Sequence, residues 1–227
     1  MRNDLVRLTG SRGIMIASLL AFLGLSAGEL ILLLVVLLTL VVARNRLGEY
    51  GQLIAINSKL ILWIAQGFGV GRIRFAPGTF GSLVGLLWFA LLLAPGSIWF
   101  YALGLVAGIF LSVWLCGAAE KILNRTDPAS VVLDEIIALP LCFAVWVGTL
   151  YYKSGVMPAP AHFFSHGNWA LTFGIFAAFR LFDVLKPWPV RQSQRLPRGW
   201  GVTMDDVLAA LYVNALVTLA WSIPVGS

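Results

Sequence analysis

The sequence predicts an all-α integral membrane protein with about six transmembrane or membrane-embedded helices and with its candidate functional residues at the cytoplasmic edge. Hydrophobic residues make up 59% of the chain and charged residues only 11%, whereas soluble domains carry roughly 25% charged residues. The mean hydropathy is +0.89. Apolar runs recur along the chain, at residues 14–43, 80–94, 97–119, 131–152, 168–182 and 203–223.

The first run, 14–43, is interrupted only by Ser26-Ala27-Gly28-Glu29. As one helix it would extend about 45 Å, which exceeds the ~30 Å hydrocarbon core. One tilted span and a hairpin that turns at the interruption both fit. A cleaved signal peptide is disfavoured because the run is too long. We therefore expect residues 1–50 to form an additional membrane anchor or hairpin ahead of a membrane domain at 51–227.

Counting spans brings the chemically interesting segments to one face. A glycine-rich loop occupies 67–82, a tight turn follows at Pro95-Gly96, and 153–167 reads as a longer loop. If the glycine-rich loop lies on one side, alternating spans return three acidic clusters to that side. These clusters are Asp134-Glu135, Asp183 and Asp205-Asp206.

The distribution of basic residues indicates that the face with the acidic clusters is the cytoplasmic one. Only Lys153 falls on the opposite side by the same count, and the positive-inside rule associates Lys and Arg with cytoplasmic loops. The net charge of +6 is not read as nucleic-acid binding, since no basic stripe with interleaved aromatics occurs. The residues on the predicted cytoplasmic face are Arg72, Arg74, Lys121, Arg125, Lys186, Arg191, Arg195 and Arg198.

The acidic clusters predict a divalent-cation site. A charge at the centre of a membrane helix costs about 2.5–3.5 kcal/mol on insertion scales, so such residues indicate function. Mg²⁺ prefers carboxylate, phosphate and water oxygens. Adjacent acids point about 100° apart on a helix, so at most one of an adjacent pair is expected to face the ion frontally. The candidate ligands are Asp134, Glu135, Asp183, Asp205 and Asp206.

Structural readings of the same residues remain open. Thr203-x-x-Asp206 matches a helix capping box, and Arg180 and Asp183 have the spacing of an intrahelical ion pair. The glycine-rich loop, which includes Thr79 and Ser82 before a helix, could bind phosphate through backbone N–H groups. Its glycines could equally serve close helix packing.

Exclusions narrow the chemistry to metal-assisted attack by water. His162 and His166 fall in the loop on the far side, and neither Cys116 nor Cys142 begins a Cys-x5-Arg phosphatase loop. A bound ion lowers the pKa of water and neutralises phosphoryl charge. Lys186 and Arg180 are the candidate partners of phosphate oxygens.

Four segments in fixed order resemble the bacterial phosphatidylglycerophosphatase A family over about residues 60–225. They are GFGVGRIRFAPGTFGSL, SVVLDEIIALP, FRLFDVLKPWPVR and GWGVTMDDVLAAL. Two departures stand out: Ala138 replaces a common glycine, and Ile73-Arg74 replaces a common Ser-Pro pair. The N-terminal 1–50 region has no counterpart in the family pattern.

The resemblance implies a multi-pass, Mg²⁺-dependent enzyme of the bacterial inner membrane, with the membrane and a phospholipid substrate as partners. It would hydrolyse phosphatidylglycerophosphate to phosphatidylglycerol and inorganic phosphate. A transporter or a structural membrane subunit with an acidic cation site is the alternative. The implied catalytic residues are Asp134, Glu135, Asp183, Lys186, Asp205 and Asp206, and the expected phosphate-binding residues are Gly69, Gly71, Arg72, Arg74, Gly78, Thr79, Ser82 and Arg180.

Overall fold

The computed structural model describes residues 50–222, which belong to one compact unit, Glu49–Ser227. This described part is all-helical and contains no strand. The run at 14–43, predicted to be an anchor or hairpin, lies outside the described residues. The longer helices are α3 (Tyr50–Ala65), α4 (Pro77–Leu93), α5 (Ile98–Leu123), α7 (Ala144–Ser154), α9 (Trp169–Leu185) and α11 (Gly199–Ser222).

Short helical segments connect these helices. They are the 3₁₀ segments η1 (Gly67–Arg72) and η2 (Leu139–Phe143) and the helices α6 (Leu133–Ala138), α8 (Pro160–Phe163) and α10 (Val190–Ser193). Each apolar run predicted after residue 66 corresponds to one helix, except that 131–152 is divided into α6, η2 and α7. The all-α prediction is confirmed for the described residues.

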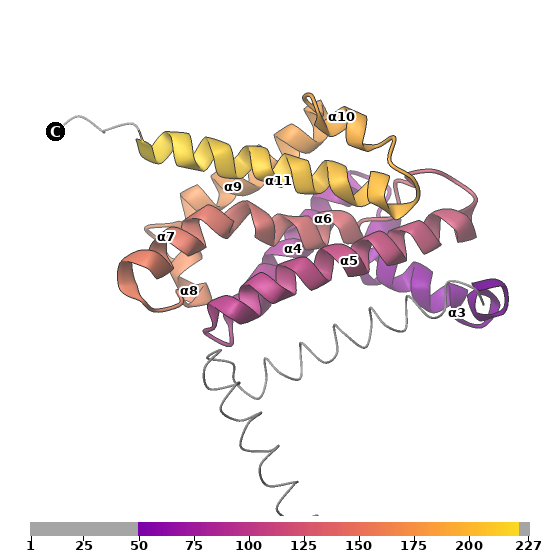
Figure 1. Ribbon diagram of the computed structural model, residues 1–227, viewed down its shortest axis with the longest axis horizontal. Helices are drawn as coiled ribbons and strands as arrows, with labels where there is room; N and C mark the ends of the chain where they lie inside the picture. The colour runs from indigo at the N-terminus through magenta and orange to yellow at the C-terminus, as the bar shows by residue number, and fades with distance from the viewer. Residues whose placement is uncertain (1–49, 223–227) are drawn as a thin grey trace, which may run out of the picture. The chain divides into compact units, whose positions relative to one another are not determined.

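Three helical stretches of the described part are long and apolar enough to cross a membrane, by length and composition alone: Ile98–Leu123, Leu133–Ser154 and Gly199–Ser222. The apolar helix Pro77–Leu93 is shorter. α5 and α11 pack against each other and run in opposite directions (Figure 1). Their pairing places the second half of α5 beside the first turns of α11, where Ser112 and Thr203 share a hydrogen bond of 2.9 Å.

The Leu133–Ser154 stretch is interrupted at η2, which contains Pro140. Proline lacks an N–H donor, so it removes a helical hydrogen bond. Asn214 of α11 satisfies the neighbouring backbone: its Oδ1 accepts from Val145 N at 2.9 Å, and its Nδ2 donates to the Leu141 carbonyl at 2.8 Å. In a membrane, backbone groups freed by a helix break require such partners. A polar side chain on α11 thus stabilises the break.

An aromatic cluster packs α4, η2 and α8 together away from the acidic residues. Phe89 stacks on Phe143 with a centroid distance of 4.2 Å, and Phe163 meets Phe89 edge-on at 4.9 Å. All three rings are fully buried. Gly85 permits α4 to approach closely, since a Cβ at this position would lie 2.8 Å from the Cβ of Leu139. This close contact fixes α4 against the segment that carries Asp134 and Glu135.

Candidate active site

Three carboxylates from two helices converge. Asp134 and Glu135 lie in the first turn of α6, and Asp206 lies in the second turn of α11. One ligand oxygen of each lies within 4.8 Å of the others. Asp134 and Asp206 are only 5% and 3% exposed. At most one member of the adjacent Asp134–Glu135 pair was expected to face an ion frontally, and the structure brings both into this carboxylate triad.

The triad has the character of a cation site. Asp134 Oδ1 and Glu135 Oε2 are buried and have no hydrogen-bond partner. Buried charges are costly unless they are paired or bind a metal, and three neighbouring carboxylates also repel one another. A hard divalent cation with oxygen ligands would relieve both costs. The donor set therefore fits Mg²⁺.

Arg180 of α9 connects the triad to a fourth carboxylate, that of Asp183. Its Nη1 lies 2.9 Å from Asp183 Oδ2 and 3.9 Å from Glu135 Oε1. The predicted Arg180–Asp183 ion pair is therefore present. Asp183 also adjoins the carboxyl group of Asp206, so the pair lies within the site. The Nε of Arg180 is buried without a partner, which leaves donor capacity for a phosphate oxygen.

Asp205 faces away from this arrangement. Its Oδ2 accepts from Lys186 Nζ at 2.5 Å and from Gln194 Nε2 at 3.0 Å, and its Oδ1 accepts from the backbone N of Asp206. Asp205 was predicted as a metal ligand together with Asp206, yet it is absent from the triad of the described residues. Adjacent positions on α11 explain the separation, because their side chains point about 100° apart.

Lys186 is held as a cation by this contact. Burial lowers the pKa of Lys186, but the hydrogen bond and the charge of Asp205 outweigh burial and raise it above its usual value. The amine therefore remains protonated at neutral pH. Lys186 ends α9 in a left-handed conformation with φ of 44°, which is uncommon for a residue with a side chain. Its position next to the carboxylates makes it a fixed positive charge.

The second half of the glycine-rich loop reaches the site. A Cβ on Gly78 would overlap Glu135 Oε1 and lie 3.0 Å from Arg180 Nη2, so the N-terminus of α4 lies directly against both residues. Ser82 Oγ donates to the Gly78 carbonyl at 2.9 Å and accepts from Arg180 at 3.2 Å. Thr79 lies between them in the first turn of α4. These three positions can line a phosphate pocket.

The first half of the loop has other contacts. Gly71 packs against the Ser130 carbonyl, and Gly69 has open space around its Cα. Arg72 Nε donates to Gln66 Oε1 at 2.9 Å. Arg72 and Arg74 are both exposed. The loop is thus divided between a packing role in its first half and contact with the carboxylates in its second.

Two features differ from the sequence interpretation. The capping-box reading of Thr203 and Asp206 is wrong, because α11 already begins at Gly199 and both residues lie inside the helix. Gln194 was missed, although its Nε2 links Asp205 to Asp127 Oδ2, the latter at 3.3 Å. A single glutamine in a polar segment gives no sequence signal of such a role.

The family model described as Phosphatidylglycerophosphatase A matches residues 63–221 of the chain. The chain belongs to the phosphatidylglycerophosphatase A family. As a member of this family it is a lipid phosphatase. The match contains every residue of the carboxylate triad, together with Arg180, Asp183, Lys186 and Asp205. No solved structure matches the chain.

Three curated relatives are similar to this phosphatidylglycerophosphatase A family member. A Phosphatidylglycerophosphatase A of Haemophilus influenzae is 32% identical over 68% of this chain and 84% of that protein. The Escherichia coli protein of the same name is 31% identical over 65% of this chain and 76% of its own length. A Putative phosphatidylinositol-3-phosphatase of Bacteroides thetaiotaomicron is 35% identical over 72% of this chain and 94% of that protein.

Proposed function

We propose that this chain hydrolyses phosphatidylglycerophosphate to phosphatidylglycerol and inorganic phosphate, in a reaction that requires Mg²⁺. The single observation that carries the Mg²⁺ requirement is the buried carboxylate triad with two oxygens that lack hydrogen-bond donors. The choice of substrate is supported by two relatives named for this activity. The Bacteroides relative favours a second candidate, a phosphatidylinositol 3-phosphate.

Asp134, Glu135 and Asp206 would hold the ion, and Asp183 would support Asp206 from α9. When bound, Mg²⁺ supplies Lewis-acid activation of water and neutralisation of phosphoryl charge. Arg180 orients the phosphoryl group, because its guanidinium can donate to two phosphate oxygens at once. The N-terminal turn of α4 adds backbone donors near Gly78 and Thr79.

Hydrolysis forms one bond between the water oxygen and phosphorus and breaks the bond between phosphorus and the glycerol oxygen. The water gives up a proton, and the leaving glycerol oxygen gains one. Lys186, protonated and held by Asp205, offsets the negative charge of the phosphate during this exchange. Asp205 is thus a positioning residue for Lys186.

The proposed setting is the inner membrane of a bacterium, with the site at its cytoplasmic edge and about six membrane-embedded helices in the whole chain. The excess of Lys and Arg on one side of the span count supports this orientation. A transporter would require charges near the bilayer midplane on broken helices. Here the carboxylates lie near the N-terminal ends of α6 and α11, which supports a site near the membrane surface and thus an enzyme.

Phosphate release by the purified full chain in detergent tests this proposal. We expect release from phosphatidylglycerophosphate with Mg²⁺, loss of release with EDTA, and recovery when Mg²⁺ is restored. Phosphatidylinositol 3-phosphate is assayed in parallel, and Lys153→Gln in the distant α7 is the matched control. Undiminished phosphate release in EDTA would contradict the Mg²⁺ requirement. Faster phosphate release from phosphatidylinositol 3-phosphate than from phosphatidylglycerophosphate would make the inositol lipid the preferred substrate.

A further inference from the structure

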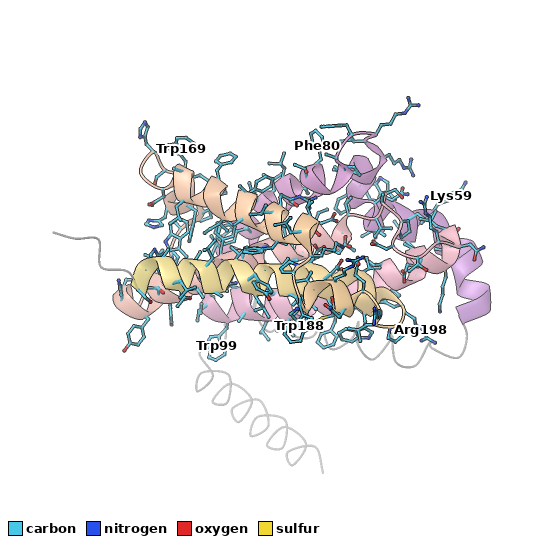
Figure 2. The ribbon with its side chains drawn as sticks, turned by 90° about the horizontal axis from the view of Figure 1, so that it is seen from above. Lys59, Phe80, Trp99, Trp169, Trp188 and Arg198 are labelled. Atoms are coloured by element: carbon cyan, nitrogen blue, oxygen red, sulfur yellow. The ribbon has the colours of Figure 1, made fainter. Side chains whose placement is uncertain are left out.

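A cavity of about 500 Å³ lies beside the active site. It is open to the surface and is lined by the last turns of α5, the loop that leads to α6, the segment after α10 and the start of α11. Figure 2 places Arg198 near the end of the compact unit that carries Lys59, far from Trp169. The polar residues that matter here are Lys121, Arg125, Asp127, Gln194 and Arg198.

The cavity offers positive charge that internal contacts leave available. Its two acidic residues keep their negative charge but are hydrogen-bonded to neutral donors: Glu120 Oε1 accepts from the backbone N of Asp127 at 3.1 Å, and Asp127 Oδ2 accepts from Gln194. Among the described residues, neither Arg125 nor Arg198 takes part in an ion pair. Two guanidinium groups therefore border the cavity without a carboxylate partner.

The position of Arg198 is fixed by packing. It adopts a left-handed conformation with φ of 60°. The next residue, Gly199, lies so close to α5 that a Cβ would overlap the Val113 carbonyl and lie 2.5 Å from Gly117 N. Strained backbone of this kind persists only where surrounding structure determines it. The backbone of Arg198 is therefore held beside the cavity by the contact between α5 and α11, and its side chain is exposed.

The cavity is connected to the active site through one side chain. Gln194 lines the cavity, and its Nε2 donates to Asp205 Oδ2, the same oxygen that accepts from Lys186. Asp205 precedes Asp206 of the triad. A ligand in the cavity would thus lie next to the group that holds the catalytic lysine.

We propose that this cavity is a second phosphate-binding subsite, in which Arg125 and Arg198 hold a phosphate group. The role of the subsite rests on the proposed function: the phosphate is either inorganic phosphate or the phosphate of a lipid headgroup. Guanidinium groups suit this ligand because they bind phosphate oxygens in pairs. The volume is ample for a phosphate with an attached glycerol.

Calorimetric titration of the full chain in detergent with inorganic phosphate, in the presence of EDTA, tests the subsite without any turnover. The wild type should bind phosphate, and Arg125→Gln and Arg198→Gln should each weaken binding by roughly tenfold or more, as expected for loss of a charge-assisted hydrogen bond. The exposed Arg195, which does not line the cavity, provides the control: Arg195→Gln should bind as the wild type does.

Arg125→Gln keeps the test valid if Arg198→Gln does not fold. Equal phosphate affinity in the cavity variants and in Arg195→Gln, or absence of binding by the wild type, would overturn the subsite. Because EDTA removes any metal-dependent chemistry, failure of this binding test leaves the hydrolysis proposal intact. Likewise, absence of hydrolysis would leave the phosphate-binding subsite intact.

The source of the phosphate is distinguished by repeating the titration in nanodiscs. One set contains phosphatidylcholine alone, and the other also contains phosphatidylglycerol. Weaker binding of inorganic phosphate in the second set supports a headgroup in the subsite. Equal binding in both sets supports free phosphate as the occupant.

Discussion

Lys186 at the end of α9 and Asp205 in the second turn of α11 form an ion pair of 2.5 Å, and this contact divides the two adjacent aspartates of α11 between separate tasks. Asp206 points to the carboxylate triad, whereas Asp205 holds the lysine. The two residues are therefore expected to respond differently to the same substitution.

Asp206→Asn should lower turnover by more than the 10–100-fold typical of losing an outer-shell partner and should weaken binding of Mn²⁺, measured by electron paramagnetic resonance. Asp205→Asn should also reduce turnover but leave the affinity for Mn²⁺ within about twofold of the wild type, since Asp205 lies outside the triad. Equal weakening of metal binding by both substitutions would contradict this division.

The Lys186–Asp205 pair predicts a loss of stability at alkaline pH. The pKa of Lys186 in the folded state is raised above its ordinary value of 10.5, so its stabilising contribution is complete below that pH and disappears as pH rises through the folded-state pKa. The difference in thermal unfolding midpoint between wild type and Lys186→Gln should be constant from slightly alkaline pH up to about pH 10.5 and shrink above it. With Lys153→Gln no such alkaline change is expected.

Gly78→Ala should impair catalysis more than folding. The added methyl group would overlap Glu135 Oε1 and crowd Arg180, which displaces a triad member. Gly174→Ala is the matched control, because the space around its Cα is open and alanine favours a helix by roughly 0.5–1 kcal/mol. Phosphate release and thermal unfolding of both variants check this. Normal turnover by Gly78→Ala would show that the loop does not confine the site.

Asn214→Leu should lower stability by about 1–3 kcal/mol, the cost of leaving buried backbone groups unpaired. It removes the acceptor of Val145 N and the donor to the Leu141 carbonyl. Thr218→Val is a suitable control, since Thr218 donates only within its own helix. Chemical unfolding in detergent provides the measurement, and an unchanged midpoint for Asn214→Leu would mean that the break at η2 needs no partner.

Topology is tested by introducing cysteines at Tyr152 and Gln192 and labelling intact cells with an impermeant thiol reagent. Both positions are exposed, whereas Ser193 next to Gln192 is buried. The native Cys116 and Cys142 are buried and should not react. We expect labelling at Tyr152, on the predicted periplasmic side, and none at Gln192 until the cells are opened. Labelling at both positions in intact cells would contradict the proposed orientation.

Helix positions and the convergence of acidic residues could be predicted from sequence, because apolar runs report burial and alternating spans dictate which ends meet. Side-chain directions could not. Asp134 and Glu135 both reach the triad although adjacent positions on a helix diverge, whereas the equally adjacent Asp205 and Asp206 are separated. The role of Gln194 depends on contacts across three separate segments, and no local pattern encodes such contacts.

The same limit applies to the glycine-rich loop. Its motif marks Gly69 and Gly78 as equivalent, yet only Gly78 contacts the carboxylates. The difference arises from where α4 begins. Pro77 occupies the first turn of α4, so Gly78 is part of this helix and is positioned by it, whereas Gly69 precedes the helix. A spacing rule identifies the loop but not which half is functional.

Asp206 and Asn214 both lie on the side of α11 that contacts the broken helix, about 12 Å apart along α11. One completes the triad with α6, and the other bonds to both sides of η2. The spacing of the proposed metal ligands therefore depends partly on the Asn214 contacts with η2 and α7, which lie away from the carboxylates. A detergent or lipid that loosens these contacts is expected to change the affinity of the proposed site for a metal ion while every ligand stays the same.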